Sequence, residues 1–115
     1  MKAMLMVPII AALAAGPVYA DCQAPDDSVQ IPSGSSATRD EMVAAQKAVK
    51  AYDTAVKSYS GCLQQEQDAK VAAGGDKQKL AQDYSKRQNA EVDKVQKVAD
   101  KFNLELRAFK AKNAG

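Results

Sequence analysis

The sequence predicts an all-α fold: a long, coiled-coil-like antiparallel hairpin of two helices, with an extended N-terminal arm stapled to the first helix by a disulfide. Three observations predict it. Apolar residues recur at alternating steps of three and four, which is the spacing of a helix-packing seam. A Gly-Gly pair separates two long stretches that contain no proline. The two cysteines lie 40 positions apart, one before the first helix and one within it.

Residues 1–20 are predicted to be a secretory signal peptide. Lys2 supplies the positive start, a short apolar run follows, and small residues precede a cut between Ala20 and Asp21. The alternative is a membrane anchor, but a spanning helix needs about 20 apolar residues, and this run is shorter and interrupted by proline. We therefore expect cleavage, a soluble mature chain, and a periplasmic or secreted location.

Cys22 and Cys62 are the two cysteines of the chain. Lipid attachment would require Cys22 to be the first mature residue, and Asp21 takes that place, so we do not expect a lipoprotein. In an exported chain, two cysteines favour a disulfide between them. Closing this loop is worth about 4 kcal/mol in the chain-entropy treatment. Two free thiols or a bridge between chains stay open as alternatives, because pairing cannot be read from sequence.

The composition indicates long helices with a narrow apolar seam and a balanced charge. The chain has 16 Lys and Arg against 14 Asp and Glu, and loss of Lys2 with the leader lowers its net charge from +2 to +1. Such a balance gives no basic field for nucleic acid. Leu, Ile, Val and Phe are sparse and alanine is abundant, which predicts a small core that gains from a covalent staple.

Residues 21–37 are predicted to form an extended arm. Their prolines, glycine and serines exclude a helix. Val29 and Ile31 alternate with polar neighbours, as in a segment that lays two side chains on a surface. A turn at residues 32–34 would let the arm run back to Cys62, because 16 extended residues reach about 50 Å and the helix covers about 36 Å.

The first helix is predicted over residues 38–73. Thr38 and Glu41 predict a capping box, in which the hydroxyl accepts from a helical amide and the carboxylate reaches back to the cap. The interaction seam against the second helix comprises Met42, Ala45, Val49, Tyr52, Val56, Tyr59 and Leu63. We expect the two tyrosines to fill the interface and point their hydroxyls outward, although they could instead stack a ligand. Gly61 in this helix reflects either a close approach of the arm or chance.

Residues 74–76, Gly-Gly-Asp, are predicted to be the turn, with Asp76 as the cap of a second helix over residues 77–111. Two such helices make a hairpin about 50 Å long. The seam of the second helix is less regular and contains one polar position. Its expected members are Leu80, Tyr84, Gln88, Val92, Val95, Ala99, Phe102, Leu106 and Phe109.

The run IPSGSSATRDEMVAAQKAVKAYDTAVKSYSGCLQQEQ, residues 31–67, resembles a group of small secreted helical-hairpin proteins of proteobacteria that have no known activity. They similarly carry an exported N-terminus, an early cysteine, an Ile-Pro-x-Gly turn, Ala-Thr before Glu-Met, and Cys-Leu. The resemblance covers about a third of the chain and leaves out the Gly-Gly turn and the second helix. It implies a periplasmic helical hairpin and transfers no functional residues.

The sequence offers little for catalysis. It has no histidine, which removes Ser/His/Asp and Cys/His arrangements. Two distant cysteines do not supply the four ligands of a zinc site. Carboxylates on the surface of a thin hairpin have no deep cleft in which to be tuned. We therefore expect no enzyme, no catalytic residues, no cofactor and no metal.

We expect an exported, non-enzymatic structural, adaptor or chaperone-like factor of the periplasm. A hairpin buries one stripe of each helix, so a second apolar surface would meet a protein partner or a second copy in a homodimer. Candidate members of that surface are Val43, Val71, Val98 and Leu104. We expect no nucleic-acid partner, and membrane contact only through the precursor's signal peptide. The alternative is a binder of anionic lipid or peptidoglycan, through Lys86, Arg87, Lys94, Lys97 and Lys101.

Overall fold

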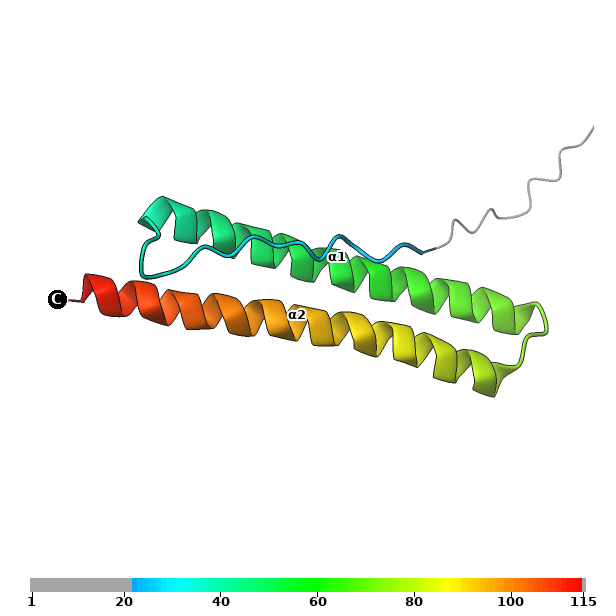
Figure 1. The fold of residues 1–115 in the computed structure, drawn as a ribbon. Helices are drawn as coiled ribbons and strands as arrows, with labels where there is room; N and C mark the ends of the chain where they lie inside the picture. The colour runs from blue at the N-terminus through cyan, green and yellow to red at the C-terminus, as the bar shows by residue number, and fades with distance from the viewer. Residues whose placement is uncertain (1–21, 115) are drawn as a thin grey trace, which may run out of the picture.

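The computed structural model describes residues 22–114, and the predicted signal peptide and its cleavage position between Ala20 and Asp21 lie outside these residues. Helix α1 spans Arg39–Ala72 and helix α2 spans Lys77–Asn113. The two helices pack side by side as a hairpin, and the N-terminal arm runs along them (Figure 1). A disulfide joins Cys22 of the arm to Cys62 of α1. The predicted hairpin with a stapled arm is therefore confirmed.

Each helix begins at a polar N-cap. The Thr38 hydroxyl accepts from the Glu41 amide at 3.2 Å and donates to Glu41 Oε1 at 3.1 Å. In the predicted capping box, the Glu41 carboxylate would accept from the backbone amide of Thr38. In the structure it accepts from the Thr38 hydroxyl instead, so the second bond of the box differs from the prediction. Asp76 Oδ1 accepts from the amides two and three residues ahead at 3.0 and 3.1 Å. Gly74 before it has a φ of 96°, the left-handed conformation common at helix ends.

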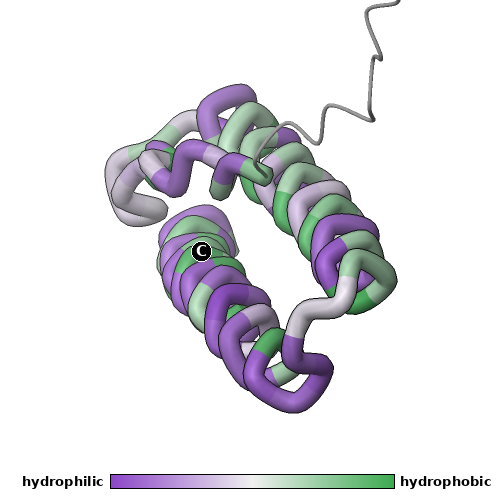
Figure 2. Tube along the Cα trace, turned by 90° about the vertical axis from the view of Figure 1, so that its right-hand side faces the viewer, coloured by the Kyte–Doolittle hydropathy of each residue, from purple (hydrophilic) through white to green (hydrophobic). Residues whose placement is uncertain are grey.

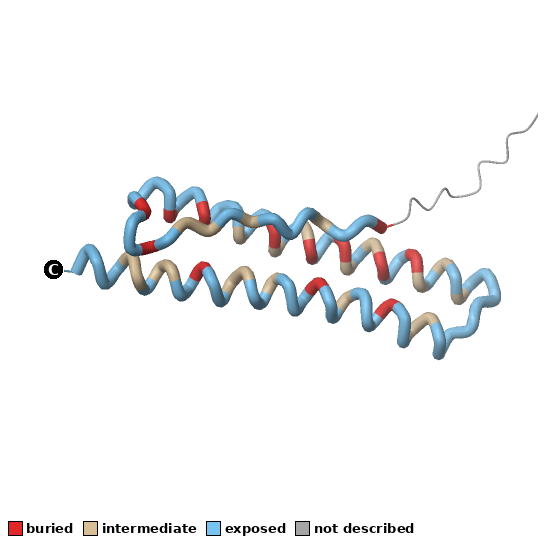
Figure 3. The backbone as a smooth tube through the Cα atoms, in the orientation of Figure 1, coloured by how far each residue is buried: buried red, intermediate tan, exposed pale blue. Residues whose placement is uncertain are grey.

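The helix interface contains two apolar clusters. The turn-end cluster, nearer the Gly-Gly turn, consists of Cys22, Tyr59, Leu63 and Tyr84, with Cys62 and Leu80 against it. The open-end cluster consists of Ala37, Met42, Ala45 and Phe102, with Ile31, Val49, Leu106 and Phe109 against it. Buried positions recur along the facing sides of the two helices (Figure 3). The seam predicted for the first helix lies in this interface, with Val49 half-buried and the others buried.

The predicted seam of the second helix is wrong at one position. Val92 is 54% exposed, whereas Glu91 is only 4% exposed. A packing seam alternates steps of four and three residues, so the seam that starts at Tyr84 passes through Gln88 to Glu91. The prediction instead took two successive steps of four and so arrived at Val92. Helix geometry therefore decides the burial, and it leaves Val92 at the border of the interface.

The arm approaches the hairpin closely at Gly34 and not at Gly61. A Cβ added at Gly34 would collide with the backbone carbonyl oxygen of Glu105 in α2. The Gly34 amide also donates to Glu105 Oε2 at 3.0 Å. A Cβ added at Gly61 would meet nothing within 4 Å. A close approach of the arm therefore does not explain Gly61.

Gly61→Ala is expected to raise the free energy of unfolding by about 1 kcal/mol, because alanine in a helix loses less backbone entropy than glycine. Gly34→Ala is the contrasting variant, and we expect it to lower the free energy of unfolding by about 1–3 kcal/mol, since its Cβ would push the arm off α2. Urea unfolding followed by circular dichroism at 222 nm measures both. A destabilised Gly61→Ala variant would show that the helix surface at Gly61 is not open.

Candidate interaction surface

The arm occupies one of the two grooves that run between α1 and α2. It begins at the disulfide in the turn-end cluster and ends in a turn at residues 33–37, where the Ala37 amide donates to the Ser33 carbonyl at 2.8 Å. Between these points, Ile31 packs against the open-end cluster and Asp27 pairs with Lys94 at 3.6 Å. Seen along the hairpin, the arm lies on one side of the helix pair (Figure 2). This groove is therefore filled by the chain itself.

A first buried polar group lies where the arm, α1 and α2 meet. Tyr52 is 4% exposed, and its hydroxyl and the Oε2 atom of Glu91 are buried without a hydrogen-bond partner. Burial, reinforced by the charge of Glu91, raises the pKa of Tyr52. Lys94 Nζ donates to Glu91 Oε1 at 3.3 Å. The prediction that the Tyr52 hydroxyl points outward is wrong, because the arm covers this side of the interface.

A second buried polar group repeats the pattern with the helices exchanged. Glu66 of α1 pairs with Lys70 at 3.5 Å, and both Glu66 and Tyr84 of α2 are buried. The Lys70 ammonium lies 5.3 Å from the centre of the Tyr84 ring, and the Arg87 guanidinium lies 5.1 Å from it. In both groups a tyrosine of one helix accompanies a Glu and Lys of the other. Because removing a charge from water costs about as much as the ion pair returns, we expect these two pairs to add little to stability.

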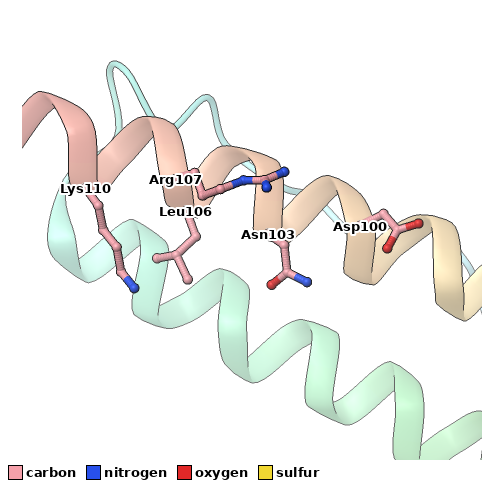
Figure 4. Close-up of a pocket in the computed structure, with 5 residues that line it drawn as sticks. All are labelled: Asp100, Asn103, Leu106, Arg107 and Lys110. Carbon is pink, nitrogen blue, oxygen red and sulfur yellow. The ribbon is translucent and has the colours of Figure 1, made fainter.

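The opposite groove, which we call the uncovered groove, has no other described segment over it. At the open end of the hairpin it forms a depression of about 220 Å³. The lining residues are Arg39, Met42, Val43, Gln46, Phe102, Leu106 and Phe109. Leu106 also lines the adjoining hollow, where Asn103, Leu106 and Lys110 point from α2 toward α1 while the arm passes behind (Figure 4).

Three pairs of apolar residues, each with one member from α1 and one from α2, line the uncovered groove. We call these pairs rungs. Within each helix their members are seven residues apart and so share one side of the helix. Met42 and Leu106 line the same depression, and antiparallel packing then sets Val49 opposite Ala99 and Val56 opposite Val92. The three rungs extend over two heptads, or about 21 Å. Val92 of the third rung is 54% exposed, and Val43, which lines the depression beside the first rung, is 41% exposed. The groove therefore has apolar surface left for a partner.

The off-seam residues expected to form a partner surface do not gather on one face. Val43 lines the depression of the uncovered groove, and Leu104 is 56% exposed elsewhere on α2. Val71 and Val98 are half-buried. Sequence reasoning missed Val92 as a surface residue because it placed Val92 in the helix seam. Val92, Ala99 and Leu106 follow one another at intervals of seven residues, and this spacing was the signal that could have found the strip.

The predicted basic face of the second helix is partly engaged by the chain itself. Lys94 pairs with Asp27 of the arm and with Glu91, and Arg87 lies over the Tyr84 ring. These contacts leave Lys86, Lys97 and Lys101 as the members that point freely into solvent. The face therefore offers less positive charge to a lipid or cell-wall surface than its sequence suggests.

Comparisons of the chain with protein families, with curated proteins and with solved structures find no match. Within residues 22–114, no helix is long and apolar enough to cross a membrane, and no group of three or more His, Cys, Asp or Glu is placed to hold a metal ion.

Proposed function

We propose that the protein is an exported, non-enzymatic helical-hairpin protein that binds a helix of a partner protein in its uncovered groove. It would act in the periplasm as a structural, adaptor or chaperone-like factor. The observation that carries the proposal is the asymmetry of the hairpin. The arm fills one groove, whereas the other offers three apolar rungs with no other described segment over them. The disulfide supports export, because such bonds persist in oxidising compartments.

The shape of the uncovered groove favours a helix over a flat surface. Met42 and Phe102 at its floor are 4% and 8% exposed, so only a side chain inserted between α1 and α2 reaches them. A helix laid along two others inserts side chains in this way. A bilayer surface is better met by apolar side chains that protrude. The groove therefore supports a protein partner more than an envelope surface.

Val92→Lys is expected to abolish partner binding, because it places a charge in the third apolar rung. The matched control is Leu104→Lys, since Leu104 is similarly exposed, at 56% against 54% for Val92, and lies outside the groove. Native mass spectrometry of the tagged protein, released from the periplasm, measures what each variant retains. We expect the wild type and the control to retain the same protein in a one-to-one complex, and Val92→Lys to be a monomer.

Two results would contradict the proposal. One is a wild-type protein that is a strict monomer and retains nothing. The other is a complex that survives Val92→Lys, or that both substitutions remove equally. Circular dichroism of each variant must match the wild type, so that a loss of binding is not a loss of fold.

A further inference from the structure

We infer that the partner helix is acidic: an amphipathic helix with apolar residues at heptad spacing and with Asp and Glu on its flanks. This inference rests on the proposed function and adds the chemical class of the partner. It comes from the charges that border the uncovered groove, and these are independent of the apolar rungs that carry the proposed function.

Four cations border the groove near its open end. Arg39 lines the depression, and Arg107 and Lys110 line the adjoining hollow. Lys50 is exposed and follows Val49 of the second rung. Among residues 22–114, the ion pairs that form involve other lysines, so none of these four cations is paired with a carboxylate of that part of the chain.

Three acidic side chains share this border: Asp53, Asp100, and Asp93, which is exposed and follows Val92 of the third rung as Lys50 follows Val49. Asp53 pairs with Lys57 at 2.9 Å. Asp100 accepts a hydrogen bond from the neutral Gln96 amide at 3.1 Å, which leaves the carboxylate charge in place. Within the described part of the chain, four unpaired cations therefore stand against two unpaired carboxylates, Asp93 and Asp100, so the border carries an excess of positive charge around an apolar floor. Complementary charge across an interface selects partners and orients them, so this border suits a partner with an excess of carboxylates.

A second copy of the chain suits the groove less well. Its own border would bring the same excess of cations, and like charges brought together disfavour a pairing. The arm shows that this hairpin accepts a third element along a groove, and it does so with an acidic contact, since Asp27 pairs with Lys94. A partner helix with flanking carboxylates would repeat that arrangement on the other side.

The rungs set the length of the partner segment. Three rungs over about 21 Å correspond to about 14 residues of a helix. The depression at Met42 and Leu106 has a volume of about 220 Å³, which is room for a large apolar side chain. Exposed ion pairs are individually weak, so the apolar anchors supply most of the affinity and the carboxylates supply the preference.

The inference is tested with two synthetic helical peptides of about three heptads. Both carry leucine at the seam positions, and their flanking positions carry glutamate in one and lysine in the other. Fluorescence anisotropy with the disulfide-intact mature protein measures Kd for each peptide. We expect the glutamate peptide to bind about tenfold more tightly at low salt, with a preference that shrinks as salt screens the charges.

A double charge reversal identifies the surface responsible. Arg107→Glu with Lys110→Glu is expected to reverse the preference toward the lysine peptide. The matched control is Lys97→Glu with Lys101→Glu, which changes the net charge equally on the side of α2 away from the groove. We expect this control to keep the preference for the glutamate peptide.

Three results would overturn the inference. Equal binding of the two peptides is the first, and an equal loss of preference in both double variants is the second. The third is flotation of the protein with phosphatidylglycerol vesicles that Arg107→Glu with Lys110→Glu abolishes, since the cations would then serve lipid. If neither peptide binds but the wild type still retains a protein that Val92→Lys loses, the acidic class fails and the proposed function stands.

Discussion

Replacing both Cys22 and Cys62 with alanine is expected to lower the free energy of unfolding by about 4 kcal/mol. The bond joins residues 40 positions apart, so its loss frees a large loop in the unfolded chain. In a domain of this size, each 1 kcal/mol moves the unfolding midpoint by about 4–8 °C, so the midpoint should fall by at least about 16 °C. Thermal and urea unfolding of the mature protein, followed by circular dichroism at 222 nm, measures the change.

The wild type treated with reductant is the control for this double substitution. It keeps the sulfur atoms that pack in the turn-end cluster with Leu63 and loses only the covalent bond. We expect it to lose most of the same stability while both helices remain. If neither the double variant nor the reduced protein loses more than about 1 kcal/mol, the bond does not restrict the unfolded chain as the loop length requires.

Leu63→Ala is expected to lower the free energy of unfolding by about 2–5 kcal/mol, because it leaves a cavity where the surrounding side chains collapse only in part. Leu63 is 0% exposed and lies in the turn-end cluster with Tyr59 and Tyr84. These neighbours come from both helices, so the cavity would open inside the pairing of the hairpin. Urea unfolding gives the size of the loss.

Leu104→Ala provides the matched comparison. The same atoms are removed, but Leu104 is 56% exposed, and surface substitutions of this kind change stability by less than about 0.5 kcal/mol. Similar losses for the two leucines would contradict the burial pattern. They would mean that α1 and α2 do not pair along the seam that contains Leu63.

The hairpin itself is predictable because local signals specify it. Thr38 and Asp76 mark the starts of the two helices, and the structure has its N-caps at these residues. The glycine pair marks the stop, and the C-cap of α1 is Ala73, directly before it. The predicted bounds, 38–73 and 77–111, differ from Arg39–Ala72 and Lys77–Asn113 by at most two residues. Differences of this size are usual at helix ends. The heptad steps of the first helix likewise specify which of its sides is buried.

The burial of Glu91 and the approach at Gly34 are less predictable, because both depend on contacts between distant segments. Glu91 is tolerated in the interface since Lys94 of its own helix donates to it, and Lys94 is in turn paired with Asp27 of the arm. No periodicity in the arm predicts that contact. Glycine is needed at position 34 because the arm meets the backbone of Glu105 there. Glu105 is far from Gly34 along the chain, so no local sequence pattern predicts this contact.

The uncovered groove is predictable in part. The spacing of Val92, Ala99 and Leu106 is visible in the sequence, and so is that of Met42, Val49 and Val56. Which groove the arm fills is not visible, because it depends on the direction in which the turn at residues 33–37 sends the arm. The direction of the arm, and not the composition of the two helices, therefore decides which apolar strip stays free for a partner.

The central claim, that a partner helix occupies the uncovered groove, is tested most directly by photo-crosslinking in the periplasm of the producing cell. The photoreactive residue p-benzoylphenylalanine is placed at position 92 in one variant and at position 104 in another, two exposed sites of α2. We predict a discrete crosslinked protein from position 92 and none from position 104. Crosslinks from neither position, or equally from both, would contradict the claim.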